Sequence, residues 1–534
     1  MFFLADAVTT ELGSSVLVTE LMIIAAVAIF VKWVRLPYSI ALVAAGLGVG
    51  ILRAQHFIDL EIVLTPELVF TIFLPVLLFE AAINLHVKHL RENAKPIALF
   101  AIPGVILASL AVGYGLNWWF GIPLAWTLVF GALVSATDPI SVLALFKELK
   151  APSRLSILVE GESLFNDGAA VVVFKILLAL AITGKFSLTS AFFSFLLVSV
   201  GGLLLGALLG YVISKLTAMI DDHLIEITLS TILAYGSYIA AEHLGVSGVM
   251  AVIAAGLIYG NYGKEIGMSP NTQVMMAAFW EYAGFLMNSL VFLLIGTQVD
   301  LRQMAHNWRE ILAAFVCVVL ARLLVMLILV PLAGKIDRPI SAAWQTVIVW
   351  AGLRGSISMA LAIGLPASEY KDQILLMTFG VVILSLFLQG LTMPKLLRGL
   401  KIIGQESDEV TNYEIKLGQM LMHQRCLKEL RRMKARLSIS VDVFDELAAP
   451  HEEAMLRLQE EVKELGTKQI SIRQEQVRDA RKNLMTAQLA TLREAYERGL
   501  ISDAVLEILT KELAEEQIKM AREEDPDHDA HPEE

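Results

Sequence analysis

Residues 155–182 read LSILVEGESLFNDGAAVVVFKILLALAI, an apolar run long enough to cross a lipid bilayer as one helix. Near its middle this run carries four ionisable or amide side chains, those of Glu160, Glu162, Asn166 and Asp167. A charge at bilayer depth costs about 2.5–3.5 kcal/mol on insertion scales, so such groups are expected to face a polar cavity and to have a function there. Glu162 and Asn166 lie four residues apart, as do Ser163 and Asp167, so two adjacent stripes of one helix direct oxygen atoms towards a common site. Such a set of oxygen ligands suits a small hard cation or a proton.

The composition excludes a soluble protein. The chain has 534 residues, of which 56% are hydrophobic, and its mean hydropathy is +0.65. Met1 to Glu11 contain no Lys or Arg, which argues against a cleaved signal peptide, so the first apolar run is expected to be retained as a span. The two cysteines, Cys317 and Cys426, indicate neither a disulfide framework nor a metal-thiolate site, and we expect no cofactor.

Apolar stretches of spanning length recur along the first 400 residues and predict an all-α polytopic membrane protein with about 13 transmembrane helices. The stretches are 16–34, 37–53, 67–86, 96–118, 123–146, 155–183, 188–217, 224–243, 247–262, 273–298, 309–334, 340–366 and 373–397. Lys and Arg concentrate in one set of alternate loops, which the positive-inside rule assigns to the cytoplasm. The amino terminus is then outside the cell membrane and the carboxyl terminus inside.

Two of these stretches contain helix breakers at mid-depth. The fifth contains Ser135-Ala136-Thr137-Asp138-Pro139, and the twelfth contains Gly352-Leu353-Arg354-Gly355-Ser356. They lie seven spans apart, an odd number, so the two broken helices run in opposite directions. This arrangement predicts inverted-topology repeats whose broken helices cross beside a site near the membrane midplane.

The last quarter of the chain differs in composition. Most of the net charge of −11 falls in residues 401–534, where apolar and charged residues alternate at helical spacing. We therefore predict a transmembrane domain over 1–400 and a small helical cytoplasmic domain over 401–534. From Glu523 onward we expect disorder.

Asp167 is the strongest candidate for chemistry, because one buried carboxylate that binds either a proton or a monovalent cation is the minimal requirement of an exchanger. The alternative is a carboxylate that staples two spans by pairing with a cation. Asp138, beside Thr137 in the break, could bind a cation together with freed backbone carbonyls, or could cap a half-helix, or both.

Five polar residues within the spans have other expected roles. Arg354 needs a partner at depth, and we expect Glu162 to pair with it and Asn166 to hydrogen-bond to the pair, in a structural role. Glu80 is interpreted either as a supporting ligand of the cation site or as half of an ion pair. Arg322 is expected to be a packing contact.

Three motifs together resemble the NhaP-type and sodium/proton exchanger branch of the monovalent cation/proton antiporters. They are Ala136-Thr137-Asp138-Pro139, Gly161-Glu162-Ser163-Leu164-Phe165-Asn166-Asp167-Gly168 and Gly352-Leu353-Arg354-Gly355. The resemblance covers about residues 15–400. It implies a homodimer in which a core domain moves against a dimerisation domain.

The same resemblance implies roles for individual residues. Asp167 would bind Na⁺ or the proton, helped by Asp138, Thr137, Ser163 and, less closely matched, Glu80, with the metal ion at Asp167 and Asp138. Glu162, Asn166 and Arg354 would form a stabilising polar cluster. Exchange would be electroneutral, because Asn166 stands where electrogenic relatives have a second aspartate.

The sequence therefore predicts an antiporter of the cell membrane that exchanges Na⁺ (or Li⁺) for H⁺ by alternating access, with membrane lipid, monovalent cations and protons as its partners and no nucleic acid. Potassium/proton exchange is the close alternative, because the ligand set does not separate the two ions. A cation channel or pH sensor could use the same polar site. An enzyme is not expected, since the chain has no HExxH or GxSxG motif.

Overall fold

The computed structural model describes most of the chain, with gaps at residues 1–13, 35–37, 55–64, 139, 150, 221, 403–407 and 437 and with only scattered positions described after 468. The chain divides into two compact units, Met1–Ile403 and Gly404–Glu534. All regular structure in the described residues is helical. The disorder predicted from Glu523 onward lies outside the described residues.

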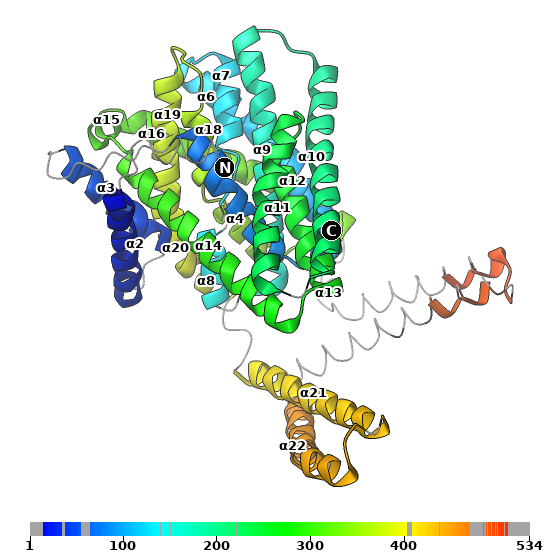
Figure 1. The fold of residues 1–534 in the computed structure, drawn as a ribbon. Helices are drawn as coiled ribbons and strands as arrows, with labels where there is room; N and C mark the ends of the chain where they lie inside the picture. The colour runs from blue at the N-terminus through cyan, green and yellow to red at the C-terminus, as the bar shows by residue number, and fades with distance from the viewer. Residues whose placement is uncertain are drawn as a thin grey trace. The chain divides into compact units, whose positions relative to one another are not determined.

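Helices of the first unit coincide with every apolar stretch predicted above (Figure 1). Their bounds are α2 Ser14–Val34, α3 Tyr38–Ala54, η1 Leu68–Phe73, α4 Leu74–Asn84, α5 Val87–Glu92, α6 Ala94–Phe120, α7 Leu124–Leu133, α8 Ile140–Glu148, α9 Ser153–Thr183, α10 Leu188–Thr217, α11 His223–His243, α12 Gly248–Ile258, η2 Tyr259–Gly263, α13 Lys264–Ile266, α14 Pro270–Thr297, α15 Leu301–His306, α16 Trp308–Ile336, α17 Ala342–Trp350, α18 Ser356–Ile363, α19 Lys371–Leu384, η3 Ser385–Gly390 and α20 Leu391–Gly399. Within the described residues, seven helices are long and apolar enough to cross a membrane, and four further apolar helices comprise 10–17 described residues. The predicted all-α membrane architecture is confirmed.

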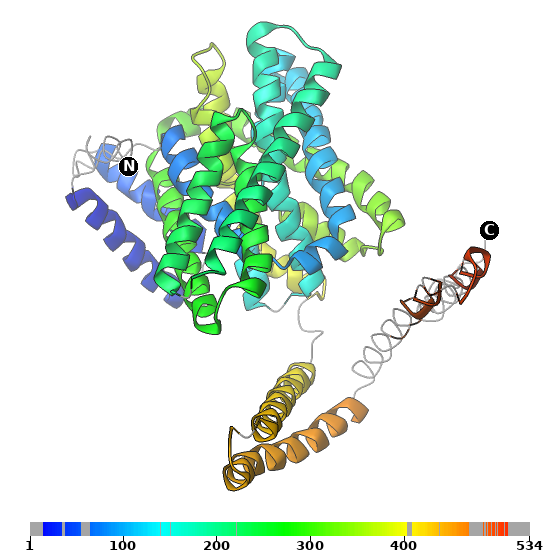
Figure 2. The ribbon, with the colours of Figure 1, turned by 45° about the vertical axis from the view of Figure 1, so that its right-hand side comes forward.

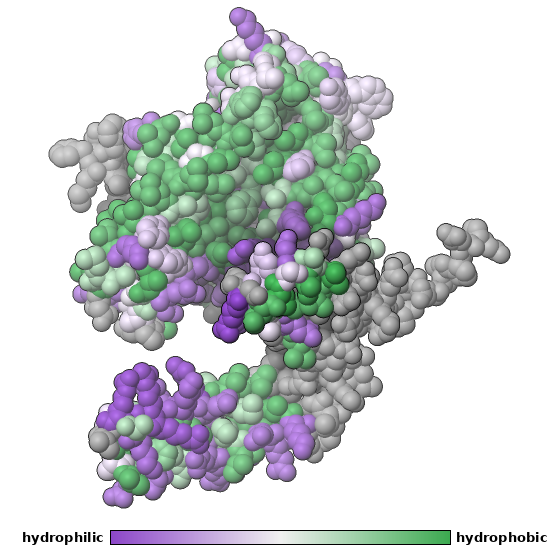
Figure 3. Space-filling view, turned by 90° about the vertical axis from the view of Figure 1, so that its right-hand side faces the viewer, coloured by the Kyte–Doolittle hydropathy of each residue, from purple (hydrophilic) through white to green (hydrophobic). Residues whose placement is uncertain are grey.

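The surface of this unit matches that architecture. Figure 3 shows hydrophobic side chains over much of its flank, with hydrophilic ones gathered towards its ends. On α10 the exposed large side chains include Phe192, Leu204 and Leu208. Helices satisfy their own backbone hydrogen bonds, so they can present such a surface to lipid without loss.

The predicted stretches 123–146 and 340–366 are both broken near their middle. Residues 134–139 separate α7 from α8, and residues 351–355 separate α17 from α18. The two breaks cross in contact, because the backbone N–H of Asp138 donates to the carbonyl of Leu353 at 2.8 Å. Gly355 permits this approach, since a Cβ atom there would lie 2.5 Å from the Cβ of Asp138. The predicted crossing of two broken helices is confirmed.

Small residues set the spacing of the unbroken helices. On α10, Gly202, Gly206 and Gly210 face α12, and a Cβ at Gly206 would lie 2.0 Å from the carbonyl oxygen of Ala251. Such stripes let helices in lipid approach until their backbones touch. At one edge of the unit, α2 and α3 lie side by side, and α3 packs on α14 (Figures 1 and 2).

In the second unit, α21 (Asp408–Ala435) packs against α22 (Val441–Lys468). Leu427 and Ala448 are buried between them. Lys416 pairs with Glu461 at 2.7 Å, and the Nδ1 atoms of His423 and His451 lie 2.8 Å apart.

Candidate cation-binding site

Helix α9 lies among α6, α7, α10 and α12 and presents its polar residues to the crossing of the broken helices. Glu162, Ser163, Asn166 and Asp167 are all buried, with 8% or less of each side chain exposed. Gly168 allows this close packing, because a Cβ there would lie 2.6 Å from Met250 of α12.

A cavity of about 350 Å³ opens between α4, α9 and the two breaks. All five residues predicted to bind the cation or proton line it, namely Glu80, Thr137, Asp138, Ser163 and Asp167. Asn84 and Lys147 also line the cavity and are exposed, whereas Asp167 is 8% exposed. The cavity therefore leads from the surface of the unit to the buried carboxyl group of Asp167.

The carboxyl group of Asp167 is not held by a cation. The backbone of Thr137 hydrogen-bonds to it, but its Oδ1 atom has no hydrogen-bond partner among the described residues. None of the ion pairs found in the described part of the chain includes Asp167. A buried oxygen without a partner is costly, and a proton or a monovalent cation would satisfy it.

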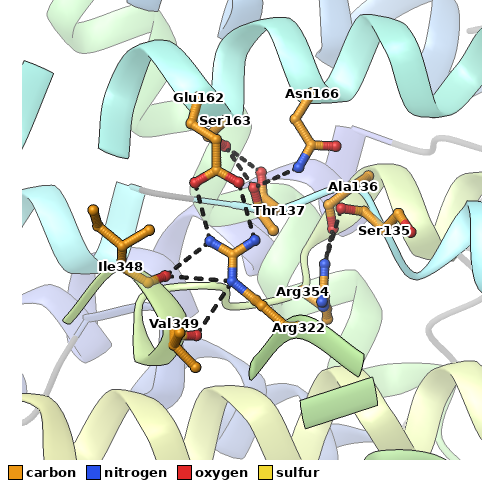
Figure 4. Close-up of polar contacts among 10 residues, drawn as sticks. All are labelled: Ser135, Ala136, Thr137, Glu162, Ser163, Asn166, Arg322, Ile348, Val349 and Arg354. Atoms are coloured by element: carbon orange, nitrogen blue, oxygen red, sulfur yellow. Dashed lines mark hydrogen bonds and ion pairs between the residues drawn. The ribbon is translucent and has the colours of Figure 1, made fainter. Parts of the chain in front are cut away.

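The break after α7 contributes ligands beside Asp167. The hydroxyl of Ser163 donates to the carbonyl of Thr137, and the hydroxyl of Thr137 donates to Ser163 Oγ at 3.2 Å (Figure 4). Asn166 Nδ2 donates to Thr137 Oγ1 at 3.4 Å. These contacts fix the unwound segment to α9, so its oxygen atoms are held next to Asp167.

Glu162 pairs with Arg322 of α16, and the prediction that Arg354 is its partner is wrong. The two carboxylate oxygens accept from Nη1 and Nη2 of Arg322, both at 3.0 Å (Figure 4). The same guanidinium donates to the carbonyls of Ile348 and Val349 at 2.9–3.3 Å. Arg322 therefore caps the carboxyl end of α17 while Glu162 neutralises it, which is more than the packing contact expected of it.

Arg354 has a parallel role at the other break. Its Nη1 atom donates to the carbonyls of Ser135 and Ala136, at 2.9 and 3.3 Å, just beyond the end of α7. Its backbone N–H donates to Ser385 Oγ at 3.2 Å. The half-helices α7 and α17 both end at the crossing, and each has a guanidinium that donates to the free carbonyl groups at its carboxyl end, Arg354 for α7 and Arg322 for α17. A cation is favourable there, because the carboxyl end of a helix carries the negative end of its dipole.

Glu80 and Lys175, two further polar residues within the spans, each contact one polar neighbour. Glu80 accepts from Asn84 Nδ2 at 3.1 Å, and no ion pair of Glu80 is found in the described residues. Lys175 of α9 pairs with Glu242 of α11 at 3.2 Å, at an exposed position. Sequence reasoning could not distinguish Arg322 from Arg354 as the partner of Glu162. It also assigned no role to Glu160, although Glu160 lines the cavity.

Comparisons with known proteins agree with this arrangement. Residues 21–399 match the family model described as sodium/hydrogen exchanger, transmembrane. The chain is 42% identical over 386 residues to the Na⁺/H⁺ antiporter ApNhaP of Aphanothece halophytica, covering 71% of this chain and 73% of that one. It is 37% identical over 510 residues to the Na⁺/H⁺ antiporter NhaG of Bacillus atrophaeus, covering 93% and 96%.

The fold is similar to that of the sodium proton antiporter MjNhaP1 from Methanocaldococcus jannaschii, with a TM-score of 0.60 at 20% identity. The superposition covers 73% of this chain and 99% of that one. The family match spans the helices that carry both breaks and the polar residues of α9. The chain belongs to the transmembrane sodium/hydrogen exchanger family.

Proposed function

We propose that this protein exchanges Na⁺ for H⁺ across the cell membrane, with the two ions competing for the carboxyl group of Asp167. The observation that carries the proposal is the unpartnered, buried Oδ1 of Asp167 in a cavity lined by further oxygen ligands. The antiporter names of relatives that are up to 42% identical to this chain over the aligned residues support Na⁺ as the cation.

Competition for one carboxylate couples the two fluxes. A charged and empty Asp167 would have to cross a low-dielectric barrier when the site changes sides, which costs several kcal/mol. The carboxylate therefore changes sides only when it is neutralised by Na⁺ or by H⁺. One carboxylate that takes one ion of charge +1 in either direction gives electroneutral exchange.

In this mechanism, Thr137, Ser163 and Asp138 supply oxygen atoms that replace water around the cation, and Glu80 supports them from α4. The Glu162–Arg322 pair and Arg354 hold the unwound segments in place. Neither guanidinium contacts Asp167 by an ion pair in the described structure, so their charge does not displace the cation.

The cavity opens at the end of the unit where α8 ends at Glu148 and α9 begins at Ser153. The distribution of Lys and Arg over the loops predicts that this end faces the cytoplasm. We therefore assign this conformation to the state open to the cytoplasm, one of the two states that alternating access requires. A cysteine replacing Lys147 would test the assignment in a variant whose Cys317 and Cys426 are changed to serine, because an impermeant maleimide should label it in inside-out but not in right-side-out vesicles.

The purified protein in proteoliposomes tests the function directly. A Na⁺ gradient should drive a change of internal pH whose rate is insensitive to an imposed membrane potential. Asp167→Asn should abolish it, because an amide can neither bind a proton nor neutralise the cation. Asp300→Asn is the matched control, since Asp300 is an exposed helix cap and asparagine caps equally well.

Two results would reject the proposal. One is Na⁺-driven pH change that persists at the wild-type rate in Asp167→Asn. The other is Na⁺ flux without any counter-transport of protons, which would indicate a channel. The homodimer implied by the family stays a prediction, which cross-linking in native membranes would check.

A further inference from the structure

The second unit contains a contact between two histidines that has no part in the exchange site. His423 of α21 and His451 of α22 face each other across the hairpin, with their Nδ1 atoms 2.8 Å apart and their ring centroids 5.1 Å apart. Figure 2 shows the two helices side by side. Both rings are half-buried, and Leu427 and Ala448 are buried one turn away along the same contact. The pair therefore belongs to the surface on which α21 and α22 pack together.

Two ring nitrogens at 2.8 Å form a hydrogen bond that contains one proton. One ring donates its N–H, and the other accepts through a nitrogen that carries no proton. A second proton would place two N–H groups, each on a positively charged ring, head to head at this distance. The closed pair therefore holds one positive charge at most, whereas two separated histidines can hold two.

The same spacing does not suit a shared metal ion. Two imidazole nitrogens bound to one tetrahedral Zn²⁺ at about 2.0–2.1 Å lie about 3.3 Å from each other. Within the described residues, no group of three or more His, Cys, Asp or Glu side chains is arranged to hold a metal ion. The contact is therefore a bond between the two rings.

Uncharged side chains flank the histidine pair on both helices. They lie three and four positions from each histidine and are Gln419, Met420, Cys426, Leu427, Leu447, Ala448, Ala454 and Met455. Cys426 is the titratable side chain among them, and it is exposed.

The charged groups nearby pair with each other across the hairpin. The pairs are Lys416 with Glu461 at 2.7 Å, Arg431 with Glu452 at 3.8 Å and Lys434 with Asp445 at 4.0 Å. Carboxylate, ammonium and guanidinium groups keep their charge between pH 5 and 8, whereas an imidazole gains one in this range. Among the contacts that join α21 and α22 in the described part of the chain, the histidine pair is therefore the one that responds to pH there.

We propose that the His423–His451 pair is a pH-sensitive switch, which keeps the α21–α22 hairpin closed near neutral pH and lets it open in acid. Separated histidines take up protons near pH 6.5, so below this pH the open hairpin binds more protons than the closed one. The stability of the closed form therefore falls as the pH falls. Opening exposes Leu427 and Ala448, which the closed hairpin buries. The switch does not depend on the exchange function proposed above.

Hydrogen–deuterium exchange of the full-length protein in detergent tests the switch. Separated helices lose most of the protection that packing gives to their amides, so exchange in α22 reports opening of the hairpin. The measured quantity is the protection factor of the amides between Ala448 and Leu458, corrected for the intrinsic exchange rate at each pH. It should fall about tenfold between pH 6.5 and pH 5.0. One proton taken up on opening is worth at most about a factor of ten per pH unit, and this uptake develops over the interval.

Two glutamine variants should abolish this pH dependence. In His423→Gln the amide oxygen can accept a hydrogen bond from the ring of His451 whether that ring is neutral or charged, so the protection factors at the two pH values should agree within about twofold. His451→Gln should behave in the same way. Lys416→Met is the control, because it removes the ion pair with Glu461. It should lower protection by the same factor at both pH values and keep the tenfold fall.

The inference is overturned if protection in the wild-type protein changes less than about twofold between pH 6.5 and pH 5.0. It is also overturned if both glutamine variants keep the tenfold fall. If the glutamine variants leave α22 unprotected at both pH values, Lys416→Met decides the question. A pH dependence that disappears in Lys416→Met would belong to the ion pairs and would overturn the assignment to the histidines, whereas one that persists supports it.

Discussion

Replacing Arg322 by methionine removes the cation from the buried pair with Glu162 while nearly keeping the length of the side chain. The carboxylate of Glu162 is 2% exposed, so it would be left charged and unpaired in the interior. Removing one partner of such a pair costs about 3–5 kcal/mol. The carbonyls of Ile348 and Val349 would lose their donor as well, which adds about 1–3 kcal/mol for a buried acceptor.

A loss of stability of this size is measurable as a decrease in the melting temperature of the purified protein in detergent. At about 2–4 °C for each kcal/mol, Arg322→Met should melt at least about 6 °C below wild type. Arg322→Lys should fall between the two, because an ammonium group keeps the charge but cannot make the two parallel bonds to Glu162.

A double-mutant cycle shows whether the pair itself is responsible. Combining Arg322→Met with Glu162→Gln should cost less than the two single changes added together, because the double variant leaves no buried charge. Arg354→Met should cost less than Arg322→Met, since Arg354 holds carbonyls and forms no ion pair with Glu162. The reasoning fails if Arg322→Met melts within about 1 °C of wild type or if the cycle is additive.

Two glycine substitutions test the close approaches. Gly355→Ala should lower the rate of Na⁺-driven pH change at least tenfold in protein that still elutes as a single species, because its Cβ would collide with Asp138 at the crossing. Its control is Gly48→Ala, which should have no effect, because a Cβ there meets nothing within 4 Å. Gly206→Ala should lower the melting temperature by several degrees, because its Cβ would lie 2.0 Å from a carbonyl oxygen of α12. Its control is Gly236→Ala on α11, where a Cβ meets nothing within 4 Å; this change should leave the melting temperature unchanged or raise it slightly.

The breaks in the two helices could be predicted because their cause is local. Pro139 cannot donate a backbone hydrogen bond, and Gly352 and Gly355 flank a charged residue within an apolar run. The breaks lie seven spans apart, and this odd separation then required the two helices to run in opposite directions. The contact between Asp138 and Leu353 agrees with the crossing that this pattern predicted.

The partner of Glu162 could not be predicted because it depends on which helix faces lie against each other. In a soluble helix the apolar stripe identifies the buried face, but in lipid the exposed face is apolar too, so periodicity loses that information. Two buried arginines, Arg322 and Arg354, were available for one carboxylate. Arg322 was the less conspicuous, because it lies in an unbroken apolar run with no motif around it.

The structure explains why α9 carries its polar residues in two stripes. One stripe, with Glu162 and Asn166, faces Arg322 and Arg354 beside the carboxyl ends of the half-helices. The other stripe, with Ser163 and Asp167, faces the cavity. The guanidinium groups of Arg322 and Arg354 thus interact with helix carbonyls, and that of Arg322 also with Glu162. These contacts lie on a different side of α9 from the cavity. A single helix can thus stabilise two broken neighbours with cations and still present a carboxylate that is available to Na⁺ or H⁺. If all four polar residues lay on one face of α9, a guanidinium would pair with Asp167, and the site would lose the competition between Na⁺ and H⁺ on which the proposed exchange depends.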